Sequence, residues 1–215
     1  MAWFQLDPHS IAARAQASGH AKPAPTLAAS VIRGILGFSL VSVAGFSPWA
    51  LFDRWFHRFG EIGLYLACAV VFIGLSGICL HRLIIGPGSL PRFYKIFTLA
   101  FTAYAVAWVA FWMWLRGDAG SIGGLLAGTA AMGFLLALAF DAPRSLLKIV
   151  AALFVFNTLG YFVGGWVEAK LPHEYRTAGM MLWGVFYGLG FGTGLGLAFY
   201  FCQEKARALI SRADS

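Results

Sequence analysis

Charged residues are scarce in this chain. Asp, Glu, Lys and Arg make up 12% of its 215 residues, whereas soluble domains carry roughly a quarter. Hydrophobic residues make up 60%, and the mean hydropathy is +0.74. These values exclude a soluble globular protein, and they exclude a disordered chain, which needs high charge and low hydrophobicity. Three cysteines are too few for a disulfide scaffold. A helical membrane protein remains.

Ionisable side chains are missing from the centres of the apolar stretches, where Asp, Glu, Lys and His are absent. Ion-coupled pumps, proton relays and voltage sensors need such groups inside the membrane. The five histidines, at 9, 20, 57, 81 and 173, lie outside these centres, so axial ligands for a haem in the bilayer are lacking. We therefore expect no cofactor, no metal and no catalytic residue, and we disfavour transport of charged substrates.

Six apolar stretches are each long enough to cross a bilayer, which takes about 20 helical residues. We expect an all-α membrane protein with six transmembrane helices in a compact bundle. Residues 1–30 lack the order of a signal peptide and are expected to form an N-terminal tail, with Ala2-Trp3-Phe4 and Ile11-Ala12 as candidates for contact with the membrane surface. Residues 203–215 form a short C-terminal tail. The expected spans are 31–52, 62–80, 94–115, 119–140, 147–167 and 178–202.

Basic residues are distributed unevenly among the connections, and Lys and Arg favour the cytoplasmic side. Five lie on one side: Arg54, Arg58, Arg116, Lys170 and Arg176. Eleven lie on the other, which is therefore expected to be cytoplasmic and to hold both termini, as in a bacterial inner-membrane protein. The net charge of +7 then reflects orientation and attraction to anionic lipid, and nucleic-acid binding loses its support. The eleven are Arg14, Lys22, Arg33, Arg82, Arg92, Lys95, Arg144, Lys148, Lys205, Arg207 and Arg212.

Tryptophans support the same boundaries, because their rings collect at membrane interfaces. Six lie near the span ends that the charge count places outside, and we interpret them as interface anchors rather than a ligand cage. They are Trp49, Trp55, Trp112, Trp114, Trp166 and Trp183.

Glycines recur at every fourth position, as in a glycine zipper. Such spacing puts them on one helix face and lets two backbones approach closely in lipid. Spans four and six should therefore pack tightly, and Gly190 with Gly194 forms a second line by which span six is held on two sides. The sequence does not indicate whether these glycine faces pack on helices of the same chain or of a second copy. The main series are Gly120, Gly124 and Gly128 in span four and Gly184, Gly188, Gly192 and Gly196 in span six.

A weak internal repeat relates the two halves of the chain. Gly45-Phe46 and Phe52-Asp53 recur 88 positions later as Gly133-Phe134 and Phe140-Asp141. Three spans per half would make the halves, 31–116 and 119–202, inverted with respect to each other. Transporters often have this arrangement, with the binding site between the halves. Chance remains the competing explanation, because Gly and Phe are abundant.

Two polar groups are candidates for a binding site. The first is a mid-membrane set, Asn157, Thr158, Thr193 and Tyr104, for which hydrogen bonding between helices is the simpler interpretation. The second is a set in the outer loops, His57, Glu61, His173 and Glu174, which lacks the ligand spacing of a metal site. An aromatic stripe on span three, for which packing or lipid contact is the simpler role, consists of Phe97, Phe101, Tyr104, Trp108 and Phe111.

Three functions follow from these features. The first is a non-catalytic protein acting through helix packing, as an accessory or assembly subunit or a homo-oligomer, with the lipid bilayer and other membrane subunits or itself as partners. The second is a facilitative permease or channel for a small neutral or apolar solute, with its site between inverted halves near Asn157, Thr193 and Tyr104. The third is a lipid-modifying enzyme that uses His and Glu residues of the outer loops.

Overall fold

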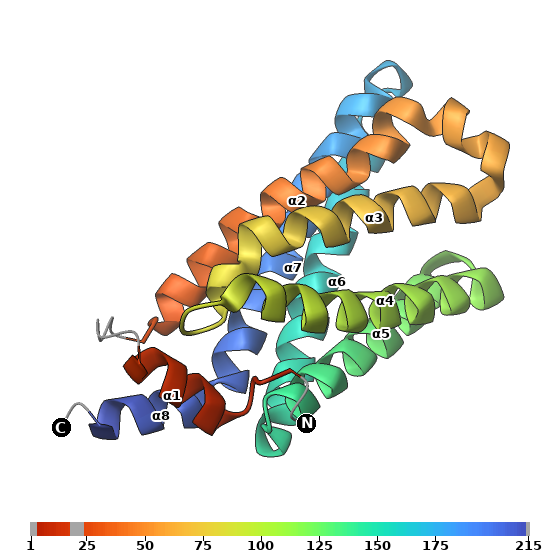
Figure 1. Cartoon of the computed structure of the whole chain (residues 1–215). Helices are drawn as coiled ribbons and strands as arrows, with labels where there is room; N and C mark the ends of the chain where they lie inside the picture. Colours follow the sequence, from red (N-terminus) through yellow and green to blue (C-terminus); the bar gives the residue numbers. More distant parts are fainter. Residues whose placement is uncertain (1–3, 18–23, 214–215) are drawn as a thin grey trace.

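The computed structural model describes residues 4–17 and 24–213. Within those ranges the protein contains α-helices and short 3-10 turns, and no strand (Figure 1). The first and last helices are short, and the six between them are long. The helices are α1 (Pro8–Ala17), α2 (Leu27–Phe56), α3 (Gly60–Leu80), α4 (Ser89–Leu115), α5 (Gly117–Ala139), α6 (Leu146–Lys170), α7 (Arg176–Cys202) and α8 (Glu204–Ala213).

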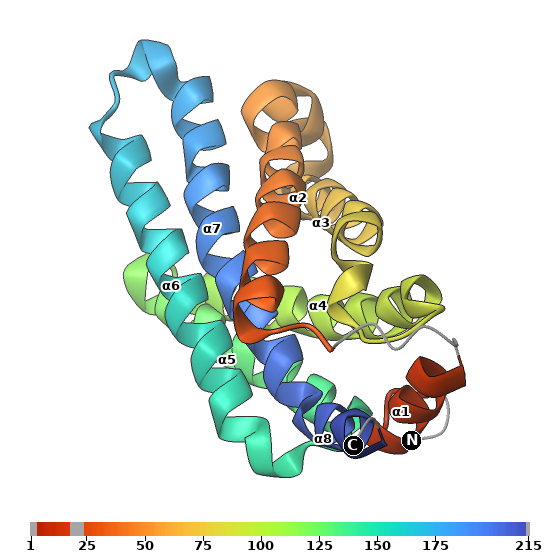
Figure 2. The same ribbon diagram turned by 90° about the vertical axis from the view of Figure 1, so that its left-hand side faces the viewer.

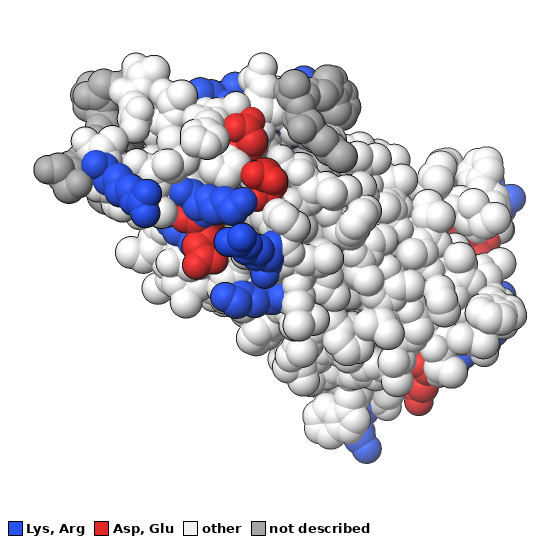
Figure 3. All heavy atoms as spheres, turned by 90° about the horizontal axis from the view of Figure 1, so that it is seen from below, with Lys and Arg blue, Asp and Glu red and all other residues white. Residues whose placement is uncertain are grey.

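The helices α2 to α7 are long and apolar enough to cross a membrane, as a search of the described residues shows. Figure 3 shows a broad uncharged surface, with most of the visible Lys and Arg gathered at one end of the molecule. The chain is therefore a multi-pass integral membrane protein, and the expected all-α bundle of six spans is confirmed. Each helix extends a few residues beyond the span expected from the sequence.

The six long helices form a closed ring in which each packs on the next and α7 packs on α2. Figures 1 and 2 show that the short helices α1 and α8 lie side by side at one end of this ring. We call this the terminal end, and it also holds the connections α3–α4 and α5–α6. The opposite, distal end holds the connections α2–α3, α4–α5 and α6–α7.

Helix α7 is held on two sides by its glycines. Backbone contacts with α2 are so close that a Cβ placed on Gly192 would lie 2.5 Å from the carbonyl oxygen of Gly34. On the other face, a Cβ placed on Gly190 would lie 2.7 Å from the Cα of Gly160 in α6. The buried hydroxyl of Ser42 also donates to the Gly184 carbonyl at 2.7 Å. These glycines therefore serve contacts within the chain.

Helix α5 uses its glycines against α4. A Cβ placed on Gly124 or Gly128 would lie 2.9 Å from the carbonyl oxygen of Trp108 or Tyr104, respectively. Gly120 packs less tightly, on the Phe111 carbonyl. Helices α5 and α7, which are the expected spans four and six, thus pack tightly through their glycine faces. The neighbour of α5 is α4, and the neighbours of α7 are α2 and α6.

Pro48 lies within α2 and removes one backbone hydrogen bond. The carbonyl of Ala44, four residues earlier, instead accepts the Ser47 hydroxyl at 2.7 Å. The helix continues past the proline and departs from helical geometry at Phe52, where φ is −124° and ψ is 17°. Ser47 thus satisfies the carbonyl that the proline leaves free, and the kink in α2 lies four residues beyond the proline.

Both tails form helices that the sequence analysis did not foresee. Helices α1 and α8 pack side by side at the terminal end (Figures 1 and 2). Phe4, Ile11 and Ala12, expected to lie on the membrane surface, are buried within the protein, and Ala2 and Trp3 lie outside the described residues. Buried Gln203, between α7 and α8, donates to the Leu83 carbonyl at 2.8 Å and accepts from the Ile85 amide at 2.8 Å. The C-terminal segment is therefore fixed to the α3–α4 connection.

Candidate functional site

A cavity of about 510 Å³ lies among α2, α3, α4, α6 and α7. Its volume falls in the range of roughly 300–1,000 Å³ that is usual for small-molecule sites. Eleven of the eighteen residues that line it are aromatic. The aromatic lining consists of Phe46, Trp49, Tyr65, Phe72, Phe101, Tyr104, Trp108, Trp112, Tyr161, Trp183 and Tyr187.

The aromatic stripe of α4 forms one wall of this cavity. Rings of Phe97 and Phe101 stack with centroids 5.3 Å apart, and Phe101 contacts Phe72 of α3 at 5.5 Å. Nearer the distal end, Tyr65 of α3 meets Trp108 edge-on at 6.1 Å. Large rings therefore separate α3 from α4, and space remains between them. The expected packing role is therefore confirmed for Phe97, Phe101 and Tyr104, which belong to the buried core. Three stripe residues, Phe101, Tyr104 and Trp108, also line the cavity.

Three hydroxyl and amide groups meet at the inner end of the cavity. Asn157 of α6, fully buried, donates through Nδ2 to the Tyr104 hydroxyl at 3.0 Å. That hydroxyl shares a second hydrogen bond of 3.1 Å with the Tyr187 hydroxyl of α7. Both tyrosines line the cavity, and Asn157 lies behind them. The structure thus joins two of the four mid-membrane candidates and adds Tyr187, which the sequence analysis missed.

The other two mid-membrane candidates lie apart from this group. Thr193 donates to the Leu189 carbonyl of its own helix at 2.7 Å, and the hydroxyl of Thr158 has no partner among the described residues. Neither threonine lines the cavity. A sequence signal for Tyr187 does exist, because a residue four positions before Phe191 lies on the same face of α7. This face meets α4, where the Phe191 ring contacts Tyr104 at 5.2 Å.

The six tryptophans expected at the interface divide into two groups. Trp55, Trp114 and Trp166 are strongly exposed, as interface anchors should be. Three others line the cavity, so their rings make contacts inside the bundle that the sequence did not predict. Trp108, also in the lining, and Trp183 each have a buried indole N–H that finds no hydrogen-bond partner in the described part of the chain. The three lining members of the six are Trp49, Trp112 and Trp183.

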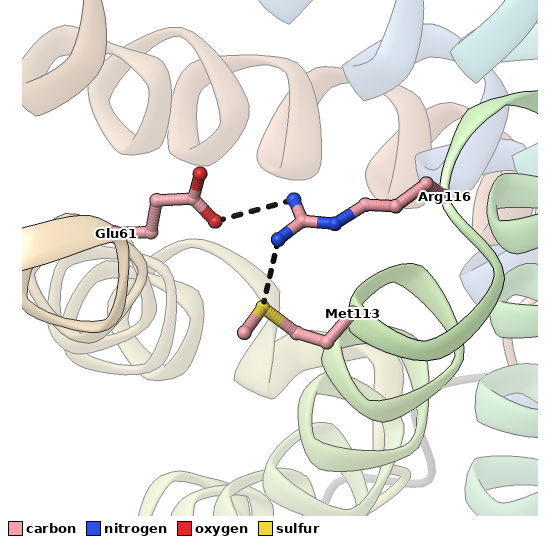
Figure 4. A network of polar contacts seen from close by, with 3 residues as sticks. All are labelled: Glu61, Met113 and Arg116. Atoms are coloured by element: carbon pink, nitrogen blue, oxygen red, sulfur yellow. Dashed lines mark hydrogen bonds and ion pairs between the residues drawn. The ribbon is translucent and has the colours of Figure 1, made fainter.

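An ion pair links α3 and α4 at the distal mouth of the cavity (Figure 4). Arg116, after the last residue of α4, lies 3.4 Å from the carboxylate of Glu61 and 3.8 Å from the sulfur of Met113. Its guanidinium also lies 5.9 Å from the centroid of the Trp112 ring. Both partners of the pair are about half exposed. Glu61 is the one charged side chain in the lining formed by the described residues.

The backbone at Arg116 lies in the left-handed half of conformational space, with φ of 53° and ψ of 172°. Such a conformation is costly for a residue with a side chain and is retained where the surroundings enforce it. The following Gly117 also has positive φ, of 54°. These two residues make the abrupt reversal from α4 to α5, and this reversal directs the Arg116 side chain toward Glu61 (Figure 4).

The outer-loop set does not converge on a metal site in the part of the chain that the structure describes. Glu61 pairs with Arg116 and borders the cavity. His173 and Glu174 are exposed in the short 3-10 turn between α6 and α7. The side chain of His57 lies outside the described residues.

The lining determines what the site can hold. Its surface is overwhelmingly apolar, with the Tyr104–Tyr187 pair at one end and Glu61 at the other. Aromatic walls of this kind favour a ligand with rings or hydrocarbon chains. Comparisons with protein-family models, curated proteins and solved structures give no match for this chain.

Proposed function

We propose that this protein is a facilitative permease for a small neutral molecule with a large apolar surface. The observation that carries the proposal is the aromatic cavity, whose size suits an organic ligand. Its inner end offers phenolic hydroxyl groups of Tyr104 and Tyr187, which can donate to or accept from one polar group of the ligand. No charge lies deep in the described lining, so a charged ligand would lose its hydration without compensation.

The ring of helices supports a site between two inverted halves. If α2, α3 and α4 correspond to α5, α6 and α7, then the α2–α7 and α4–α5 contacts are equivalent. Both contacts are mediated by glycines. The cavity is lined by α2, α3 and α4 of one half and by α6 and α7 of the other. This position resembles the midplane sites of transporters built from inverted repeats.

We further propose that both termini are cytoplasmic in a bacterial inner membrane. The support is the excess of basic residues in connections at the terminal end, eleven against five. In this orientation the distal mouth with Glu61 and Arg116 faces the outside. The ligand would then enter from the outer surface or the outer leaflet.

We place this proposal ahead of an assembly or accessory role because of where the glycines lie. That role was suggested by glycine faces available to a partner. The series on α5 and α7 contact α4, α2 and α6 of the same chain. A partner subunit or second copy would therefore have to use the outward-facing surface, which is also the surface that lipid covers.

A binding experiment tests the cavity. Purified protein in phosphatidylcholine nanodiscs is titrated with N-phenyl-1-naphthylamine, a neutral probe that fluoresces in apolar surroundings. The variant Ala105→Phe places a ring in the cavity, whereas Val106→Phe adds the same ring one residue later, at a side chain that is 64% exposed on the outer surface. We expect saturable binding to the wild type and to V106F, and about tenfold weaker binding to A105F.

Two results would overturn the proposal. One is probe binding that does not saturate above the background of empty nanodiscs. The other is equal binding by A105F and V106F, which would place the probe at the lipid-facing surface. Transport itself is tested by loading proteoliposomes with the probe, since an active permease must accelerate its exit and A105F must slow that exit.

A further inference from the structure

Two arginines border the glycine-containing connection at the terminal end of α3 and α4. Arg92 lies in the first turn of α4, and Arg14 lies in the last turn of α1. Helix α1 packs on the connection so closely that a Cβ placed on Gly86 would lie 3.8 Å from the Cβ of Arg14 and 3.7 Å from the Ala15 nitrogen. Segments far apart in sequence thus bring two cationic groups to one place.

Arg92 is anchored by uncharged oxygens. Its Nη1 donates to the carbonyls of Pro87 at 2.9 Å and Gly88 at 2.7 Å, and its Nη2 donates to the amide oxygen of Gln5 at 3.3 Å. Its Nε is buried and has no hydrogen-bond partner in residues 4–17 and 24–213. These contacts orient the guanidinium without neutralising it.

Arg14 is less well satisfied. Its Nε and Nη2 are buried and have no hydrogen-bond partner among the described residues. Burial lowers the pKa of Arg14, and the nearby charge of Arg92 lowers it further, while Asp7 acts in the opposite sense. A guanidinium nevertheless keeps its proton in proteins. Among the described residues, three buried nitrogens of two neighbouring guanidinium groups therefore lack an acceptor: Nε and Nη2 of Arg14 and Nε of Arg92.

Leaving charged donors buried and unpaired is costly, so such a group calls for a counterion. An anion with several oxygens meets the need best, because guanidinium groups bind phosphate through paired, charge-assisted hydrogen bonds. Helix α4 begins directly after Gly88, and no side chain caps it. The N-terminus of a helix adds a partial positive charge that favours the same kind of ligand.

We propose that Arg14 and Arg92 bind a phosphate group at the terminal end of the bundle. Arg92 lies in the first turn of the apolar span Ser89–Leu115, and Arg14 lies beside Gly86 in the connection that precedes this span. Lipid phosphates are found where apolar spans begin and end. The phosphate of an anionic lipid is therefore one source, and a soluble phosphate compound is the other. This proposal is independent of the cavity, which opens at the distal end.

The test measures protein unfolding temperature in a neutral detergent during two titrations. One arm adds dioleoyl-phosphatidylglycerol, with dioleoyl-phosphatidylcholine as its neutral comparison, and the other adds inorganic phosphate. Arg14→Gln removes one proposed ligand group, and Arg144→Gln is the matched control, because it removes the same charge from an exposed position at the same end. We expect apparent affinity about tenfold weaker in R14Q and unchanged in R144Q.

A third variant, Arg14→Lys, keeps the charge and loses the paired donors, so it should fall between the wild type and R14Q. A response to phosphatidylglycerol alone identifies a lipid headgroup as the source, and a response to inorganic phosphate identifies a site that also accepts soluble phosphate. Equal weakening in R14Q and R144Q would show diffuse surface attraction and overturn the proposal. So would the absence of stabilisation in both arms.

Discussion

The α3–α4 and α6–α7 pairs join helices consecutive in the chain, yet they pack in opposite ways. Between α6 and α7 the backbones approach so closely that a Cβ placed on Gly160 would lie 2.6 Å from the Phe186 carbonyl oxygen. Between α3 and α4, rings such as Phe72 and Phe101 hold the helices apart. In lipid no hydrophobic force closes such a gap, so side-chain size determines helix separation.

Side-chain size thus distinguishes the two pairs, because glycines let α6 and α7 meet, whereas aromatic residues border a cavity beside α3 and α4. In an inverted repeat the two pairs would correspond, and each would carry the same contact. Here one carries glycines and closes, and the other carries aromatic residues and stays open. The opening therefore follows from the size of the residues at the α3–α4 contact.

The largest expected effect comes from opening the closed pair. Gly160→Ile should force α6 from α7 and destabilise the protein by about 3 kcal/mol or more, because overpacking against rigid backbone cannot relax easily. Gly74→Ile is the control, since a Cβ at Gly74 meets nothing within 4 Å. Thermal unfolding in detergent should show a large decrease for G160I and little change for G74I. Equal stability of the two variants would contradict the account of the closed pair.

An intermediate effect is expected at the inner end of the open pair. Tyr104→Phe removes the acceptor of Asn157 and the partner of Tyr187, and should cost about 1 kcal/mol. Tyr187→Phe removes one of these bonds and should cost less. The free energy of unfolding measures both. A Y104F variant as stable as wild type would show that the group does not fasten α4 to α6 and α7.

The smallest effect is expected at the mouth. Glu61→Gln breaks an ion pair whose partners are about half exposed, so the loss of stability should stay within about 0.5 kcal/mol and shrink in high salt. The same variant should nevertheless speed the exchange of bound N-phenyl-1-naphthylamine, measured by stopped-flow fluorescence. Unchanged exchange would mean that the ion pair does not restrict entry.

Sequence reasoning predicted the spans well because apolar length alone determines them. It also predicted close glycine packing, since spacing of four puts glycines on one helix face. The partner of each face was not predictable, because Gly192 and Gly34 meet only through the tertiary arrangement. The tails were missed for a similar reason, since α1 is short and is buried through contacts with distant segments.

The candidate site was only partly foreseen. Asn157 and Tyr104 were identified as polar groups inside the membrane, but Tyr187 was passed over among many aromatic residues. Tryptophans at helix ends satisfy two requirements with one residue type, interface anchoring and cavity lining. The position of a tryptophan along its helix does not distinguish these two roles. Trp112 lines the cavity, whereas Trp114, two residues later, is exposed on the outer surface.

The contact between α2 and α7 also has a consequence for biosynthesis. The hydrogen bond from Ser42 to Gly184 joins residues 142 positions apart, so the first span is made long before the last. At synthesis rates of about 5–20 residues per second, α2 waits roughly 7 to 28 seconds for its main partner. During that interval its glycine face and its serine hydroxyl are open to lipid, to the insertion machinery or to a neighbouring chain. The ring can close only when the final helix arrives.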